Sequence, residues 1–283
     1  MRERRARFPG QYLLIGVVVL YVGLLIAAPL VALVQHALSK GPAPLVTALS
    51  GPDVVHAFAV TLLLTLGAAL INLVGGVLLA WVLVRHTFPG RQLWIALIDM
   101  PFVISPVIIG YVLLVLFGSG GWLQIPDVPV AFALPGMLIA TVIVSMPFVV
   151  REVMPILAAL GLEQEEGAYT LGASRWLTFR RIIFPEIRLA VLYGVALTVA
   201  RALGEFGAVL VIGGAIQGYT ESATIYIYRA LNIRGSVGAY GAAILLGGLS
   251  VLLLIGMDRF RRRVEQRRGE SVEGEGQYVY SVD

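Results

Sequence analysis

The sequence predicts an all-α membrane protein with six transmembrane helices. Of its 283 residues, 58% are hydrophobic and only 13% are charged, and the mean hydropathy is +0.88. Soluble domains carry roughly a quarter charged residues, so this composition excludes an ordinary soluble fold. The apolar residues also gather in runs of the length that a helix needs to cross a bilayer, about 20 residues.

Six such runs can be placed along the chain. We expect transmembrane helices at residues 12–34, 57–84, 93–118, 131–150, 189–213 and 237–257. The first run follows a basic stretch, as the apolar part of a signal peptide does. Its apolar core is too long for a signal peptide and no small-residue cleavage site follows it, so we expect a retained membrane anchor.

Basic residues lie mainly on one side of this arrangement. Seventeen of the 21 lysines and arginines fall before the first helix, after the last, or in the second-to-third and fourth-to-fifth connections. Cytoplasmic segments of membrane proteins carry such an excess, so we expect both termini in the cytoplasm. The expected organisation is a cytoplasmic segment at 1–11, a membrane domain at 12–257 and a disordered cytoplasmic tail at 258–283, which is rich in charge and glycine.

The sequence offers few groups for catalysis or metal binding. It has no cysteine, which excludes disulfides and cysteine-ligated zinc, and His36, His56 and His86 lie far apart. It contains no Ser/His/Asp set that would support catalysis. We therefore expect that the chain is not an enzyme, holds no cofactor of its own, and has membrane lipid but no nucleic acid among its partners.

The cytoplasmic connection at 151–188 is the longest polar stretch between two expected helices, and it contains EEGAYTLGASRWLTFRRIIFPE. Glycines at 161 and 172 interrupt it, Ser174 can cap a helix start, and Pro185 is expected to end that helix before the next span. Periodicity alone favours amphipathic helices that rest on lipid headgroups.

The spacing within this connection changes that interpretation. It resembles the EAA loop of ATP-binding-cassette (ABC) importer permeases, which has the form EAA, three residues, G, nine residues, I-x-L-P. The matching residues are Glu166, Ala168, Gly172, Ile182 and Pro185. Gly167 and Phe184 depart from that form. The resemblance implies a type I importer permease fold, with this loop as a coupling helix docked on a separate ATPase. The chain has no GxxxxGK[ST], so that partner would bind ATP and Mg²⁺.

Four further blocks are similar to permeases of oxyanion importers. They are FPGRQ at 88–92, DMPFVISP at 99–106, PFVVRE at 147–152 and RALGEFG at 201–207. Among such permeases the chain most resembles the W-type subunit of sulfate/thiosulfate importers. The resemblance implies a T-type permease partner, two copies of an ATP-binding subunit and a periplasmic sulfate-binding protein, in a bacterial inner membrane. A molybdate or tungstate permease is the alternative, and a secondary anion transporter fits less well.

Charged residues inside the expected spans are further candidates for function. A charge at the bilayer centre costs roughly 2.5–3.5 kcal/mol on an insertion scale, so Arg201 is expected to pair with Glu205, one helical turn on. This pair would either help an oxyanion across or hold its helix in the bundle. Asp99 lies among prolines that free backbone carbonyls, and we expect it to repair a broken helix, with Ser105, rather than to line a path. Asn72 is expected to form an interhelical hydrogen bond.

Overall fold

The structure is a computed structural model that describes residues 10–124, 128–233 and 237–279. These residues form helices and connections, with no strand among them. The helices are α1 (Gly10–Leu38), α2 (Pro42–Leu49), α3 (Pro52–Arg85), α4 (Arg91–Val103), α5 (Pro106–Phe117), α6 (Leu134–Ala159), α7 (Glu163–Thr170), α8 (Arg175–Thr178), the π-helical turn η1 (Phe179–Ile183), α9 (Phe184–Leu203), α10 (Gly207–Gly213), α11 (Ala223–Asn232) and α12 (Val237–Val279).

Five stretches of the described chain are long and apolar enough to cross a membrane, which confirms a multi-pass all-α protein. They are Tyr12–Leu38, Pro52–Arg85, Leu134–Ala159, Arg175–Leu203 and Val237–Arg259. A sixth span is formed if α4 and α5 count together, although the two are bent by 117° at their junction. The six runs expected from the sequence are therefore all helical, but two of them have a different shape.

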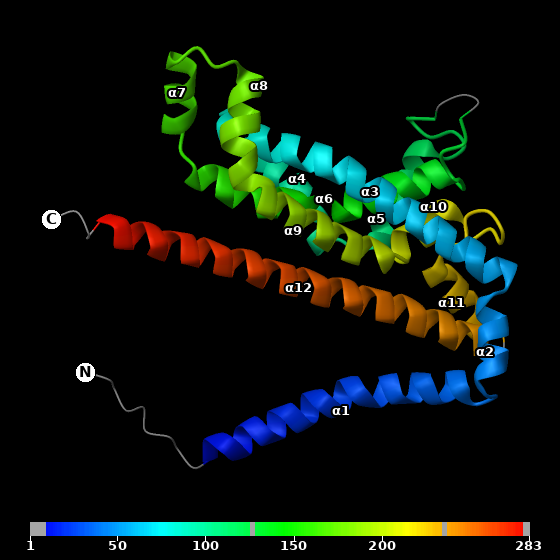
Figure 1. Ribbon diagram of the computed structural model, residues 1–283. Helices are drawn as coiled ribbons and strands as arrows, with labels where there is room; N and C mark the ends of the chain where they lie inside the picture. The colour runs from blue at the N-terminus through cyan, green and yellow to red at the C-terminus, as the bar shows by residue number, and fades with distance from the viewer. Residues whose placement is uncertain (1–9, 125–127, 234–236, 280–283) are drawn as a thin grey trace.

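Helices α3, α6 and α9 pack against one another at the centre of the molecule. Figure 1 shows α7 and α8 at one end of this bundle and α2, α10 and α11 at the other. The start of α1 and the far end of α12 lie toward the α7 end. Helix α1 contacts α12 and α2, and apolar side chains along its length are exposed.

Among the described residues the bundle has a large apolar core toward each end and a small third core formed by Leu203, Ala223 and Leu246. The core on the α7 side includes Leu83 of α3, Val149 and Leu157 of α6, and Ile187 of α9. The core on the opposite side joins α3, α5, α6, α10 and α11, and its buried residues include Leu64, Leu113, Met137, Ile212 and Ile225. Burial of apolar side chains holds α3 and α6 together in both places, and α9 joins them in the core on the α7 side.

Between the two cores lies a buried polar layer. Asn72 of α3 donates hydrogen bonds from Nδ2 to Ser145 Oγ at 2.9 Å and to the Val142 carbonyl at 3.2 Å, both on α6. Thr198 of α9 donates to the Ser145 carbonyl at 3.4 Å. The interhelical bond expected of Asn72 is confirmed. Such bonds between membrane helices are stabilising by about 0.6 kcal/mol on average.

The third span is broken, as the prolines suggested. Helix α4 ends at Val103, and α5 begins at Pro106 with Ser105 at its N-cap, where the side chain forms no capping hydrogen bond. Proline at the first helical position is favourable because its missing N–H would have no partner there. The chain can therefore restart at a new angle, and the break expected within the span at 93–118 is confirmed.

The fifth span differs from the expectation. The helix begins earlier, at Arg175, and ends at Leu203, so a single helix over 189–213 is wrong. Glu205 Oε1 accepts a hydrogen bond from the Ala208 N–H at 3.0 Å and so caps the start of α10. A Cβ added to Gly207 would meet Val107 Cγ2 at 2.8 Å. The absent side chain thus lets α5 approach α10 closely.

The chain ends fall partly outside the described residues. Residues 1–9 of the expected N-terminal segment are outside them, and α12 continues as backbone helix to Val279, through the region expected to be a disordered tail. Arg, Glu and Gln, which are frequent in that region, have good helix propensity. The domain bounds stay predictions.

Candidate functional site: the coupling segment and the intramembrane ion pairs

The polar segment between α6 and α9 is shorter than the sequence suggested. Helix α6 runs to Ala159 and a helical stretch resumes at Arg175, so residues 160–174 with α7 make up what we call the coupling segment. Gly161 and Gly172 have φ values of +63° and +84°, a region that favours glycine. The two glycines allow the sharp reversals on either side of α7, which projects from the bundle (Figure 1).

The motif residues in and around α7 have unequal exposure. Glu166 is exposed on α7, whereas Ala168 is buried against the bundle. Gly172 is exposed, and a Cβ added there would meet nothing within 4 Å. The exposed face of the coupling segment thus includes Glu166 and Gly172.

Several large apolar side chains close to Gly172 in the sequence are exposed to solvent. Leu171 is 90% exposed and Trp176 is 69% exposed. Leu162 and Tyr169 are also exposed. Exposed apolar clusters rimmed by polar groups are typical of protein interaction surfaces, so this end of the molecule can dock another protein.

Ile182 and Pro185 lie in a continuous helix, which corrects one expectation. Pro185 does not end a helix, because α8, η1 and α9 follow one another without interruption. In a regular α-helix a proline removes one hydrogen bond and clashes with the carbonyl four residues before it. Here the wide π turn lies just before Pro185, and the Phe184 N–H donates to the Phe179 carbonyl, five residues back. Ser174 Oγ caps the start of α8 by accepting from the Leu177 N–H at 3.3 Å, as expected.

A buried ion pair joins the coupling segment to the bundle. Arg85 Nη2, at the end of α3, lies 2.6 Å from Glu165 Oε1 of α7, and the two side chains are only 7% and 8% exposed. The Arg85 guanidinium also lies over the Trp81 ring, 5.9 Å from its centre. The motif pointed to Glu166 and missed Glu165. A signal was present, because Glu165 and buried Ala168 are three residues apart and share a face of α7.

Arg201 and Glu205 lie together at the far end of α9. Arg201 Nη1 is 2.6 Å from Glu205 Oε2, with the Arg201 side chain 31% exposed and Glu205 3% exposed. Because α9 ends at Leu203, the pair spans the end of the helix and not the middle of a span. The Glu205 carbonyl accepts from Thr224 Oγ1 at 2.7 Å, so α11 is tied to the same turn.

Asp99 has a different partner from the one expected. Arg151 of α6 donates from Nε to Asp99 Oδ1 at 2.7 Å, and its Nη2 contacts Oδ2, so the pair is bidentate. The expectation that Asp99 repairs the broken helix is wrong, and Arg151 lies in α6 rather than in a cytoplasmic connection. The Arg151 side chain is 57% exposed on this chain. A charged group in a span avoids lipid, so water or another protein must cover this surface in the membrane.

A fourth ion pair was not found from the sequence. Arg229 donates to both carboxylate oxygens of Glu221, at 2.6 and 3.1 Å, and Glu221 is 1% exposed. This hydrogen bonding raises the pKa of Arg229. Arg229 Cζ also lies 5.7 Å from the centre of the Tyr226 ring, and burial raises the pKa of Tyr226. The pair secures the start of α11 at the end of the bundle opposite α7.

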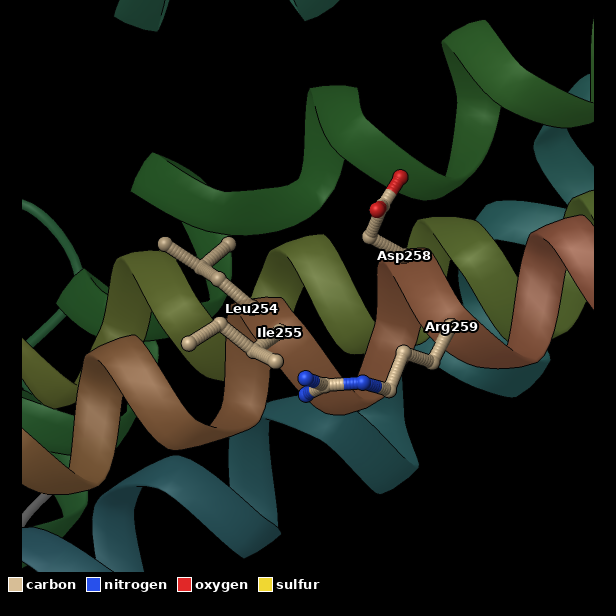
Figure 2. A pocket seen from close by; sticks show the side chains of 4 residues that line it. All are labelled: Leu254, Ile255, Asp258 and Arg259. Atoms are coloured by element: carbon tan, nitrogen blue, oxygen red, sulfur yellow. The ribbon is translucent and has the colours of Figure 1, made fainter.

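Helix α12 carries a hollow on its surface. Its lining is Leu254, Ile255, Asp258 and Arg259, with the apolar pair one turn before the charged pair (Figure 2). Within the part of the chain that the structure describes, no group of three His, Cys, Asp or Glu could hold a metal ion. The functional features of the described residues are thus the ion pairs and the exposed apolar surface near Gly172.

Comparison with known proteins agrees with this picture. Residues 72–269 match the family described as binding-protein-dependent transport system inner membrane component. The sulfate transport system permease protein CysW of Escherichia coli (strain K12) is 41% identical over 270 residues, covering 93% of each chain. CysT of the same strain, also a sulfate transport system permease protein, is 40% identical and covers 92% of this chain and 97% of its own length.

A solved structure has the same fold. The chain is similar to one from a bacterial alginate ABC transporter in complex with an alginate pentasaccharide-bound periplasmic protein, with a TM-score of 0.72. The match covers 90% of this chain and 95% of the other at 19% identity. The similarity extends through the bundle and shows that the fold is that of an ABC importer permease.

Proposed function

We propose that this chain, which belongs to the family of inner-membrane components of binding-protein-dependent transport systems, is the permease subunit of an ATP-driven importer of sulfate and thiosulfate. The observation that carries the proposal is the 40–41% identity to sulfate transport permeases over more than nine-tenths of the chain. The W-type assignment rests on the FPGRQ and DMPFVISP blocks and on LYGV at 192–195, since the identities to CysW and CysT, 41% and 40%, are too similar to decide between the two types.

The importer that we propose contains this chain, a T-type permease, two copies of an ATP-binding subunit and a periplasmic sulfate-binding protein. ATP and Mg²⁺ bind to the ATP-binding subunits, and hydrolysis takes place there. This chain supplies the path and the coupling segment. The exposed apolar residues around Gly172 support docking of the ATP-binding subunit at that segment.

We infer that the chain lies in a bacterial inner membrane with both termini in the cytoplasm. The placement of its basic residues supports this orientation, since 16 of the 21 remain on this side once Arg151 of α6 is left out. The start of α1 and the far end of α12 also lie toward the end of the bundle that carries α7 (Figure 1). The coupling segment is then cytoplasmic, where an ATP-binding subunit can reach it.

Transport follows from movement of the coupling segment. When the two ATP-binding subunits close on ATP, they draw the docked segments together and the spans open to the periplasm. Hydrolysis then resets the spans inward. Arg201 lies near the outer end of α9 and keeps part of its guanidinium exposed, and a guanidinium matches an oxyanion with forked donors. Pairing with Glu205 attenuates its charge, which suits passage better than storage.

Uptake of radiolabelled sulfate into proteoliposomes tests this function. The complex is purified through a tag on this chain, reconstituted with the binding protein and supplied with ATP inside the vesicles. We expect ATP-dependent uptake that thiosulfate inhibits and molybdate does not. Inhibition by molybdate would move the substrate to that anion, and loss of the ATP-binding subunit under gentle extraction would favour a secondary transporter.

A substitution at Gly172 tests the docking surface. Gly172→Trp adds bulk where this chain leaves open space, so we expect normal membrane insertion but loss of ATP-driven uptake. Its φ of +84° would strain most side chains, so Gly172→Asn, which tolerates that conformation, serves as the matched control and should retain most uptake. Uptake that survives Gly172→Trp would contradict docking at this segment.

A further inference from the structure

We propose that Glu165 and Arg85 are positioning residues that transmit movement of the coupling segment to α3 and so couple ATP hydrolysis to transport. This inference rests on the proposed function and adds the residues through which the docked segment acts. Glu165 is distinct from Glu166, its exposed neighbour in the motif. One glutamate faces outward, where a partner can reach it, and the other faces inward to the bundle.

The geometry of the pair suits transmission of force. The 2.6 Å contact is between side chains that are 7% and 8% exposed, so little water competes with it or screens it. Breaking a buried ion pair by removing one partner is unfavourable, because the remaining charge is left uncompensated. A movement of α7 away from α3 would therefore have to take Arg85 with it.

A second contact ties the helix that follows the coupling segment to the same place. Trp81 of α3, one turn before Arg85, packs edge-on against Phe179 of η1, with ring centres 5.7 Å apart. Phe179 in turn stacks on Trp176 of α8 at 5.8 Å. Both α7 and α8 are thus fastened to the last turns of α3, one by charge and one by aromatic packing.

Helix α3 can carry the movement into the membrane. It packs against α6 and α9. Ala80 and Leu83, which lie within two residues of Trp81 and Arg85 in α3, are part of the buried core on the α7 side. Packed interiors transmit displacement because they have little free volume. A shift at Arg85 therefore reaches the central helices without passing through the loop residues of the segment.

The isosteric change Glu165→Gln tests the link in the reconstituted complex. Three quantities are measured: the ATP-binding subunit that co-purifies with this chain, the ATPase rate, and sulfate taken up per ATP hydrolysed. We expect full co-purification, an ATPase rate within about twofold of wild type, and at least a tenfold fall in uptake per ATP. Glu186→Gln, at an exposed glutamate of α9 outside the coupling segment, is the matched control and should leave all three unchanged.

A covalent cross-link between positions 85 and 165 tests whether the ion pair transmits movement or only stabilises the fold. This chain has no cysteine, so Arg85→Cys/Glu165→Cys introduces two unique thiols when the partner subunits are cysteine-free. We expect this variant to hydrolyse ATP without uptake, and a short bifunctional thiosulfonate to restore uptake until a reductant releases it. A monofunctional reagent should have no such effect.

The outcomes distinguish failure of this inference from failure of the proposed function. Absence of sulfate uptake by the wild-type complex would overturn both. Wild-type uptake together with unchanged uptake per ATP in Glu165→Gln would overturn the inference alone. Failure of Glu165→Gln to assemble while Glu186→Gln assembles, or failure of the cross-link to restore uptake, would also overturn it, because the pair would then serve folding rather than transmission.

Discussion

Gly194 of α9 lies directly against the backbone of α6, and replacing it should destabilise the bundle. A Cβ at this position would be 2.7 Å from Val149 Cα and 3.2 Å from the Phe148 carbonyl oxygen. Carbon atoms in contact are normally about 3.5–4.0 Å apart. Backbone atoms cannot rotate out of the way, so α6 and α9 would have to separate by about 1 Å.

The expected cost can be worked from this contact. Overpacking a well-packed interior costs about 1–3 kcal/mol, and a rigid backbone neighbour places Gly194→Ala at the upper end. Alanine recovers up to about 1 kcal/mol through its better helix propensity. We therefore expect a net loss of about 2 kcal/mol in the free energy of unfolding, which is close to a 30-fold change in the folded-to-unfolded ratio.

Unfolding of the detergent-purified protein, followed by circular dichroism as a denaturing detergent is added, measures this loss. Gly67→Ala is the matched control, because a Cβ there would meet Leu138 Cδ1 at 2.8 Å, the far end of a flexible side chain. Leu138 can change its rotamer, so we expect a loss below about 1 kcal/mol. Equal stability of the two variants would refute the reasoning.

Three further predictions concern the buried polar layer and the ion pairs. Asn72→Ala removes the hydrogen bonds to Ser145 and to the α6 backbone, and we expect a loss of about 1 kcal/mol in the same unfolding assay. Asp99→Asn leaves Arg151 charged and without its carboxylate, so we expect less protein in the membrane fraction by immunoblot, with recovery in Asp99→Asn/Arg151→Gln. Partial burial raises the pKa of Tyr226 from its ordinary value, so the stability that the neutral phenol contributes is fully present below that ordinary value and is lost as pH rises through the raised value. Ultraviolet titration should show this late step in the native protein, and Tyr226→Phe should lack it.

The sequence was sufficient for the fold class because hydropathy depends on composition and run length alone. It also found the break in the third span, since Pro101 and Pro106 have fixed local consequences in any helix. The end of α9 was missed because the run of mostly apolar residues continues past Leu203 to Gly213. The helix ends there because Glu205 caps α10, a contact that depends on how the chain turns in space.

The ion pairs show the same limit. Arg201 and Glu205 are four residues apart, so their spacing alone suggested the contact. Arg151 and Asp99 are 52 residues apart, and their pairing exists only once α4 packs on α6. Burial distinguishes Glu165 from Glu166, and the EAA form begins at Glu166, so it does not include the glutamate that faces the bundle.

The π turn at Phe179–Ile183 has a consequence for the tolerance of this region to insertion and deletion. A π turn contains one residue more than a regular helical turn, and each residue of an α-helix advances by about 100°. Removing one residue here would restore a regular helix and leave α8 and α9 in nearly the same rotational phase, because the π turn takes up the extra residue within about one turn. Removing one residue from the regular part of α9 instead would turn Trp176 and the docking surface by about 100° relative to the rest of that span. The π turn is therefore a position where the chain can lose a residue while the docking surface keeps its direction.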